Sequence, residues 1–179
     1  SSSYAAAFLN GGILDVAQIT QGSTTGTNLL YLNGGVIRNR TTHTSFLQNL
    51  TAGYVQAGGA TFDVLSNTTI TVAQPLLHSP ELGATADGGL RKSGFGSLIL
   101  TGTNTLSGAL VVEQGALLFN NVNAFLSGYA GTITLSSPTA SIGFNKSGAL
   151  SYLLAKLTEG STGSLALMTN NAAESIDLS

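Results

Sequence analysis

Short runs of alternating apolar and polar residues recur along most of the chain. Each run spans a few residues and ends at Gly-Gly, Ser-Gly, Ser-Asn or Ser-Pro. Five pairs of apolar residues two positions apart show the pattern: Phe62 and Val64, Ile70 and Val72, Leu98 and Leu100, Ile133 and Leu135, and Ile142 and Phe144. A period of two bounded by turn residues predicts short, half-buried β-strands. The same pattern returns at 164–167 and 175–178.

A glycine pair recurs along the chain and divides it into similar units. The segment FLNGGIL at 8–14 is repeated 23 residues later as YLNGGVI at 31–37, and looser copies follow at 55–61, 88–90 and 112–118. This alignment gives one shared position to Phe8, Tyr31, Val55 and Val112, and another to Ile13, Val36, Ala60, Leu90 and Leu117. Apolar positions that align at intervals of about 20 to 30 residues indicate a solenoid. Strand periodicity within each unit predicts a parallel β-helix, with the aligned apolar positions facing its core.

Composition agrees with stacked coils. Charged residues make up 8% of the 179 residues, and 23 residues are glycine. Neighbouring coils of a β-helix lie about 4.8 Å apart, and two like charges at that spacing repel by about 1 kcal/mol even in water. Ser, Thr and Asn can instead hydrogen-bond to their own copies. Asn10 and Asn33 are therefore predicted to form an asparagine ladder beside glycines that adopt positive φ.

One segment departs from the strand pattern. Leu150, Leu153, Leu154 and Leu157 follow the i, i+3, i+4, i+7 spacing of an amphipathic helix, and Gly160 supplies a stop signal. Ser147 or Ser151 could provide the N-terminal cap. The spacing predicts one short helix near 148–158 within an otherwise all-β chain.

Charge and cysteine content exclude several classes of function. The net charge of −2 and pI near 5.5 give no basic footprint for nucleic acid or for an anionic membrane. No cysteine is present, which excludes disulfides, thiolate metal sites and thiol catalysis. The apolar runs are far shorter than the roughly 18 residues of a membrane-spanning helix, so no membrane insertion is expected. The uncharged polar surface favours an extracytoplasmic location.

The segment 88–117 resembles the autotransporter-associated β-strand repeat. It reads GGLRKSGFGSLILTGTNTLSGALVVEQGAL, with a Gly-Gly-Leu opening, a Lys-x-Gly-x-Gly turn, a Leu-x-Leu-x-Gly strand, an Asn-Thr-x-x-Gly turn and a Val-x-x-Gly-x-Leu close. Leu106 stands where an aromatic residue is usual. The best match covers residues 88–119, and the segment 59–76 resembles the lead-in common in these proteins.

The resemblance implies a passenger region of a bacterial surface or secreted protein, folded as a right-handed parallel β-helix. We expect residues 1–179 to form a single β-solenoid segment of a longer passenger array, with a translocator barrel or anchor elsewhere in the full-length protein. The residues assigned to structural turns are Asn10, Gly11, Gly12, Asn33, Gly34, Gly35, Gly58, Gly59, Gly88, Gly89, Gly94, Gly96, Gly102, Gly108 and Gly115.

Candidate chemistry is sparse. Asp63 and Asp87 lie about one coil apart and could face one another near Arg91 and Lys92, as the carboxylates of a polysaccharide-cleaving enzyme must. Solvated turn residues are the favoured interpretation of the acids, and a structural turn role is favoured for Arg91 and Lys92. The four remain a speculative surface-binding set.

The two histidines lack a recognisable catalytic or metal-binding spacing. His43 and His78 are expected to form surface or loop hydrogen bonds. No Gly-x-Ser-x-Gly elbow occurs, and Gly89 replaces the lysine that a phosphate-binding loop beginning at Gly83 would need. No catalytic residue, cofactor or metal is therefore assigned.

Three functions from different classes remain. The favoured hypothesis is a non-catalytic passenger or stalk segment, extracellular or at the bacterial cell surface and associated with the outer membrane. An adhesin module that binds glycan or a host surface protein is the alternative, since outward tyrosines can stack on sugars. Tyr31, however, is expected to be core or half-buried. A polysaccharide-cleaving β-helix enzyme is the third.

Overall fold

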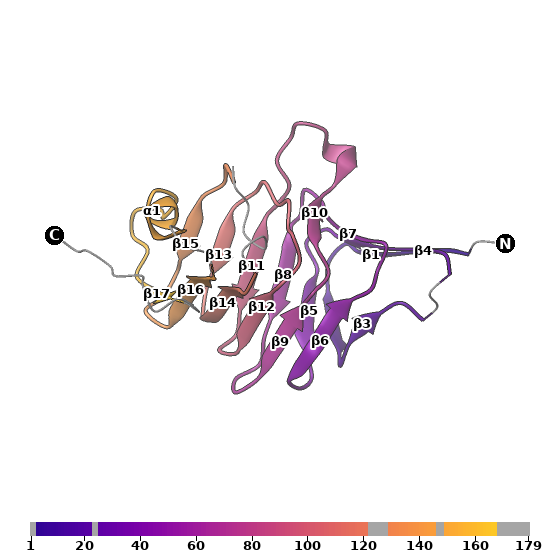
Figure 1. Cartoon of the computed structure of the whole chain (residues 1–179), viewed down its shortest axis with the longest axis horizontal. Coiled ribbons are helices and arrows are strands. Elements are labelled where there is room, and N and C mark those ends of the chain that lie inside the picture. Colours follow the sequence, from indigo (N-terminus) through magenta and orange to yellow (C-terminus); the bar gives the residue numbers. More distant parts are fainter. Residues whose placement is uncertain (1–2, 23–24, 122–128, 146–148, 168–179) are drawn as a thin grey trace.

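The computed structural model of the chain is a β-solenoid in which three sheets run along one axis (Figure 1). It describes residues 3–22, 25–121, 129–145 and 149–167. About six coils stack on one another, and the paired strands of the described residues are parallel. The predicted all-β parallel helix with one short α-helix is confirmed, while its right-handedness stays a prediction.

Over its first four coils the chain passes through sheets A, B and C in turn, so successive strands there belong to different sheets and strands of successive coils pair within one sheet. Sheet A contains β1 (Tyr4–Leu9), β4 (Thr27–Leu32), β7 (Ala52–Val55) and β10 (Leu76–His78). Sheet B contains β2 (Ile13–Val16), β5 (Val36–Asn39), β8 (Ala60–Asp63), β11 (Leu90–Ser93), β13 (Leu110–Val112) and β15 (Ile133–Leu135). Sheet C contains β3 (Ile19–Thr20), β6 (His43–Gln48), β9 (Thr69–Val72), β12 (Ser97–Leu100), β14 (Gly115–Phe119), β16 (Ala140–Phe144) and β17 (Ser164–Leu167).

Alternation along these strands places one apolar stripe of each sheet inside the solenoid. Ile70, Val72, Leu98 and Leu100 are fully buried, and their strands pair so that Leu98 lies over Ile70 and Leu100 over Val72. The core therefore grows by repetition of like on like, and apolar area removed from water drives the stacking. The predicted strand at 164–167 coincides with β17, whereas the one at 175–178 lies outside the described residues.

The predicted register is wrong by one residue at the third repeat. The alignment pairs Tyr31 with Val55, but the structure pairs Tyr31 with Tyr54. After the turn, Val36 pairs with Thr61 instead of Ala60. The third turn between sheets A and B is two residues longer than the second. Aligning the two turns on their glycine pairs therefore displaces the residues on either side by one position.

Two further assignments from the repeat alignment are corrected. Gly115 does not lie at the corner between sheets A and B, because it begins β14 of sheet C, and Val112 belongs to sheet B. Val36 does not face the core: it is half-buried on the outer face of β5, while Ile37 beside it points inward and is 1% exposed. The sequence does not distinguish a glycine at the corner between sheets B and C from one at the corner between sheets A and B.

The fourth coil carries an excursion between sheets A and B. It runs from 79 to 89, contains the single-turn 3-10 helix η1 (Pro80–Leu82) and protrudes above the stack in Figure 1. Sheet A ends at β10, but the next coil still stacks there: Thr105 N–H donates to Leu76 O at 2.9 Å. Asn104 also turns its side chain inward, and its Oδ1 accepts from Leu76 N–H at 2.9 Å.

The helix α1 (Ala149–Leu154) is shorter than the predicted 148–158 and lies near the C-terminal end of the stack (Figure 1). Leu153 is buried against the core. Leu157 instead forms a parallel bridge with Ile133, with Ile133 N–H donating to Lys156 O at 2.8 Å. Leu157 N–H still donates to Leu153 O at 3.1 Å, so the chain passes directly from the end of the helix to the bridge with β15. The predicted cap Ser147 lies outside the described residues.

An aromatic row follows the outer face of sheet A. It consists of Phe8, Tyr31 and Tyr54, which occupy one register position in three successive coils. Phe8 and Tyr31 stack with ring centroids 4.6 Å apart, and the centroids of Tyr31 and Tyr54 are 5.4 Å apart. Tyr31 is half-buried as predicted, but Phe8 and Tyr31 lie on the outer face, so the expectation that this aligned position faces the core is wrong. Phe8 and Tyr31 are nearly parallel, whereas the ring planes of Tyr31 and Tyr54 are tilted by 33°.

Candidate functional site

Asp63, Asp87, Arg91 and Lys92 do not converge on one site. Asp63 ends β8, and its Oδ2 lies 2.8 Å from both Nε and Nη2 of Arg38 in the preceding coil. Arg91 points outward from β11 and pairs with Glu113. The two ion pairs belong to neighbouring parts of sheet B, and each is satisfied within the stack.

Charges on the outer face of sheet B alternate in sign from coil to coil. Asp15, Arg38 and Asp63 occupy one register position in three successive strands. Asp15 also accepts a 2.9 Å contact from Arg40. Such exposed pairs contribute at most about 1 kcal/mol each to stability. At this register position the coils therefore stack opposite charges on one another.

Lys92 points into the solenoid although it is a lysine. It lies between Phe62 and Val112 in the register of sheet B and is fully buried. Its Nζ donates to the carbonyl oxygens of Ser93 and Gly94 at 2.7 Å and of Gln114 at 3.2 Å. The ammonium thus ties together two stacked turns between sheets B and C.

Burial lowers the pKa of the Lys92 ammonium from 10.5 to about 8, and the negative charge of Asp63 opposes that shift. Three N–H donors meeting three carbonyl acceptors match the protonated group in number. An inward position with every donor engaged leaves this lysine no free hydrogen-bonding capacity for a ligand. Lys92 therefore lies inside the solenoid and bonds to the turn that follows its own strand.

The structure brings together His78, Asp87 and Ser107, which we call the Asp87 cluster. His78 Nδ1 lies 3.0 Å from Asp87 Oδ2, and Ser107 Oγ lies 2.9 Å from the same oxygen and 3.0 Å from the same nitrogen. His78 Nε2 lies 3.1 Å from Gly83 O within the excursion. The sequence order gave no signal for this cluster, because coil stacking, and not spacing, joins residues 78 and 107.

The Asp87 cluster has the residue types of a serine hydrolase but not its geometry. A nucleophilic serine needs one imidazole nitrogen while the acid holds the other. In this cluster, Ser107 and Asp87 share Nδ1, and the carbonyl of Gly83 occupies the position beside Nε2. These hydrogen bonds connect the excursion to the stacked coils. Neither imidazole nitrogen is left to activate Ser107 as in a catalytic triad.

Asp87 is the centre of that connection. Its side chain is fully buried and accepts backbone N–H bonds from Gly89, Ser107 and Gly108 at 2.8 to 3.0 Å. Burial by itself raises the pKa of the carboxyl, but the hydrogen bonds from Ser107, His78, Gly108 and Gly89 outweigh it, so the pKa lies below its usual value. Asp87 is therefore held as a structural carboxylate inside a turn.

The predicted turn residues lie at corners of the solenoid, where coils approach one another closely. Asn33 Nδ2 donates to Asn10 Oδ1 at 3.3 Å, so the expected ladder contact is present. Positive φ occurs at Gly11, Gly12, Gly34, Gly59, Gly89, Gly94 and Gly115, whereas it is not found at Gly35, Gly58, Gly88, Gly96, Gly102 or Gly108. At Gly89, a Cβ would lie 2.0 Å from Ala109 O in the next coil. Backbone proximity, as well as conformation, selects glycine at that corner.

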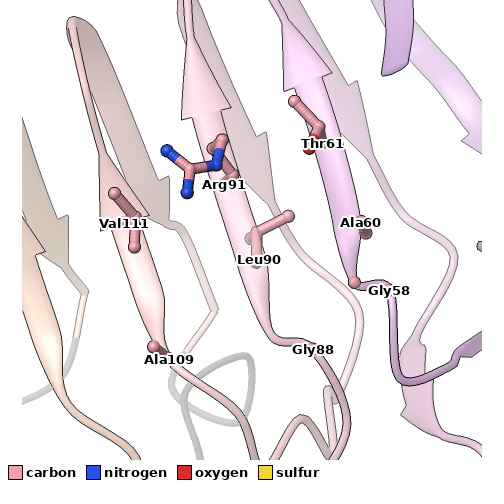
Figure 2. Close-up of a pocket in the computed structure, with 9 residues that line it drawn as sticks. Gly58, Ala60, Thr61, Gly88, Leu90, Arg91, Ala109 and Val111 are labelled. Carbon is pink, nitrogen blue, oxygen red and sulfur yellow. The ribbon is translucent and has the colours of Figure 1, made fainter. Parts of the chain in front are cut away.

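Small residues at one corner open a groove of about 190 Å³ on sheet B (Figure 2). The groove is lined by Gly58, Gly59, Ala60, Thr61, Gly88, Leu90, Arg91, Ala109 and Val111. Figure 2 shows the Arg91 side chain extending from β11 toward β13, the strand before its partner Glu113. The groove offers backbone groups and one paired cation to a ligand, and no acidic side chain lines it.

A second groove of about 460 Å³ lies where sheet C turns into sheet A. It carries no charged side chain and is lined by Gln48, Asn49, Leu50, Thr51, Ala73, Gln74, Pro75, Leu77 and Thr103. Gln74 Oε1 accepts a hydrogen bond from Leu50 N–H at 2.8 Å, which links two of the lining residues. Leu77 continues the register of the aromatic row, because it pairs with Tyr54. The groove suits an uncharged polar ligand.

The remaining candidates give no chemical centre. His43 Nδ1 accepts from Ser45 N–H at 3.1 Å, a local hydrogen bond. Across the described residues, no three His, Cys, Asp or Glu side chains are grouped as metal ligands would be. A search of the same residues finds no helix long and apolar enough to cross a membrane.

Comparison with known proteins assigns one segment of this β-solenoid. Residues 90–119 match the family model of the passenger-associated-transport-repeat, and they comprise β11 to β14 with the corners between them. The match confirms the resemblance seen in the sequence and covers about one sixth of the chain. Neither the curated proteins nor the solved structures contain a match.

Proposed function

We propose that the chain is a non-catalytic structural segment of a bacterial autotransporter-like passenger, displayed at the cell surface or secreted. One observation carries the proposal: the repeat that matches the passenger family supplies the sheet B and sheet C strands of two consecutive coils, and these strands stack in register. In such an array each coil is stabilised by its neighbours. A low-charge stack of this kind makes a stiff spacer.

The arrangement of its ionisable groups supports a structural role. Asp63 and Glu113 are each held by an arginine of the stack. Asp87 is buried in its turn and Lys92 in the core. A glycosidase would instead keep two carboxyl groups open toward one substrate.

Export and folding outside the cell test the proposal. The chain would be placed between a secretion signal and a translocator barrel, and its surface appearance followed by antibody labelling and added protease on intact cells. We expect a labelled, protease-resistant chain. Gly89→Val, which clashes with Ala109, should be exported less or degraded. Gly22→Val, whose Cβ would meet no described atom within 4 Å, should behave like the unaltered chain. Retention of the unaltered chain inside the cell would contradict the proposal.

Adhesion is the second candidate, and the uncharged groove beside the aromatic row supports it. Amide and hydroxyl groups of Gln48 and Thr103 border that groove, which suits a neutral glycan or a polar protein segment. A glycan array and a cell-binding assay with the purified chain test it. Binding that is lost in Gln48→Ala with Thr103→Ala would favour an adhesin, and absence of any binding would favour a spacer.

A further inference from the structure

Two Asn-Gly dipeptides occupy equivalent turns in neighbouring coils. Asn10-Gly11 follows β1, and Asn33-Gly34 follows β4, which pairs with β1. Asn-Gly is the dipeptide most prone to deamidation, because the glycine amide nitrogen can attack the asparagine side chain without hindrance from a Cβ. The same reactive dipeptide therefore occurs twice, in two different structural environments.

The first dipeptide is open to this reaction. Asn10 is exposed, and a Cβ built on Gly11 would meet no atom of the described residues within 4 Å. The Gly11 N–H forms no hydrogen bond with any residue that the structure describes. The nucleophilic nitrogen is therefore free to move toward Asn10 Cγ.

Three hydrogen bonds hold the reacting groups of the second dipeptide. Gly34 N–H, the corresponding nucleophile, donates to Gly59 O at 2.9 Å. Asn33 Oδ1 accepts from Gly58 N–H at 2.8 Å, and its Nδ2 donates to Asn10. Attack at Asn33 requires the turn to open first, whereas attack at Asn10 does not.

We propose that Asn10 is a site of spontaneous deamidation in the folded chain, and that Asn33 is protected. The Gly11 nitrogen forms a bond to Asn10 Cγ and gives up its proton, and the Cγ–Nδ2 bond breaks as ammonia leaves with that proton. The resulting succinimide is opened by water at either carbonyl. One opening yields aspartate and the other isoaspartate, and no oxidant or reductant is involved.

Asn33 also assists the reaction at its neighbour. Its Nδ2 donates to Asn10 Oδ1 at 3.3 Å, the oxygen on which negative charge develops as the Gly11 nitrogen attacks. A donor placed at such an oxygen stabilises the charge of the transition state. Asn33 is therefore a positioning residue for the modification of Asn10.

The test compares both sites in one molecule. The folded chain is kept in mildly alkaline buffer, and samples are digested with trypsin over time. No Lys or Arg precedes Arg38, so one peptide carries both sites, and fragment-ion masses assign each deamidation. We expect Asn10 to react at least about tenfold faster than Asn33, a barrier difference of about 1.4 kcal/mol. Equal rates, or faster reaction at Asn33, would overturn the proposal.

Two controls separate structure from sequence. In denaturant the two sites should react at similar rates, and an Asn10 that stays intact in the folded chain while it reacts in denaturant would also overturn the proposal. Asn33→Asp keeps an acceptor for Gly58 N–H but loses the donor to Asn10. It should slow deamidation of Asn10 in the folded chain only. An unchanged or faster rate would refute the assisting role of Asn33.

Discussion

Replacing the buried lysine of the B–C corner tests how the solenoid accommodates a charge. In Lys92→Met the side chain keeps its length but loses three N–H donors. Ser93 O retains a bond from Val64 N–H at 3.0 Å, so Gly94 O and Gln114 O are the acceptors most affected. Leaving a buried carbonyl without a partner costs about 1 to 3 kcal/mol. Removing a buried ammonium recovers part of that loss, and we expect a net destabilisation of about 2 kcal/mol at neutral pH.

The pH dependence makes the test specific. Below about pH 8, Lys92 is protonated in both the folded and the unfolded chain. Between about 8 and 10.5 the folded chain has released the proton while the unfolded chain still holds it, so the stability of the unaltered chain rises with pH. Lys92→Met has no such gain, and its deficit should therefore widen by at most about 3 kcal/mol over that range.

Urea unfolding followed by circular dichroism at several pH values measures both quantities. Arg91→Met is the matched control, because its side chain is half exposed and paired with Glu113. It should cost no more than about 1 kcal/mol and should show no added pH dependence above pH 8. A Lys92→Met deficit that stays constant or shrinks above pH 8 would refute the reasoning, because the three carbonyls would then be holding the ammonium more firmly than burial disfavours it.

Three further predictions concern the turns and the register. Asp87→Asn should destabilise the chain by about 3 kcal/mol. Because the pKa of Asp87 is lowered in the folded chain, the stability that its carboxylate contributes is present above about pH 3.8 and is lost as the pH falls through the folded value. The free energy of unfolding should therefore fall less steeply with acid in the variant. Gly89→Val should prevent folding or lower the melting temperature sharply, and Gly22→Val should not; equal melting temperatures would contradict the backbone contact at Ala109. Ile37→Asp should cost several kcal/mol, about 3 or more, whereas Val36→Asp on the outer face should cost less than about 1; a reversed order in urea unfolding would mean that the register of β5 is wrong.

The sequence was sufficient for the architecture because its signals are local and repeated. Alternation at Ile70 and Val72, and again at Leu98 and Leu100, predicted strands that the structure contains and stacks. The register was not predictable from the glycine pairs, since the third turn between sheets A and B is two residues longer than the second although both contain one pair. Val36 was assigned to the wrong face for that reason.

The candidate site was less predictable because its contacts are made between coils. Ser107 meets Asp87 and His78 only after the chain has completed another turn, and the sequence carries no spacing rule for such a meeting. Lys92 was identified through the repeat, but its charge favoured a turn position, although it lies two residues after the inward Leu90 and so on the same face of the strand. The ion pair between Arg38 and Asp63 was missed for the same reason as the Asp87 cluster.

The alternating charges on sheet B have a consequence for how the coils find their partners during folding. With correct stacking, Arg38 lies between Asp15 and Asp63. If a coil were skipped, Asp15 would lie beside Asp63, and two like charges at strand spacing would repel by about 1 kcal/mol in place of an attraction of similar size. Exposed ion pairs that add little to the stability of the finished fold can thus disfavour an incorrectly assembled one. Because the coils are built from similar residues, a few charges of alternating sign favour the pairing of each coil with its correct neighbour.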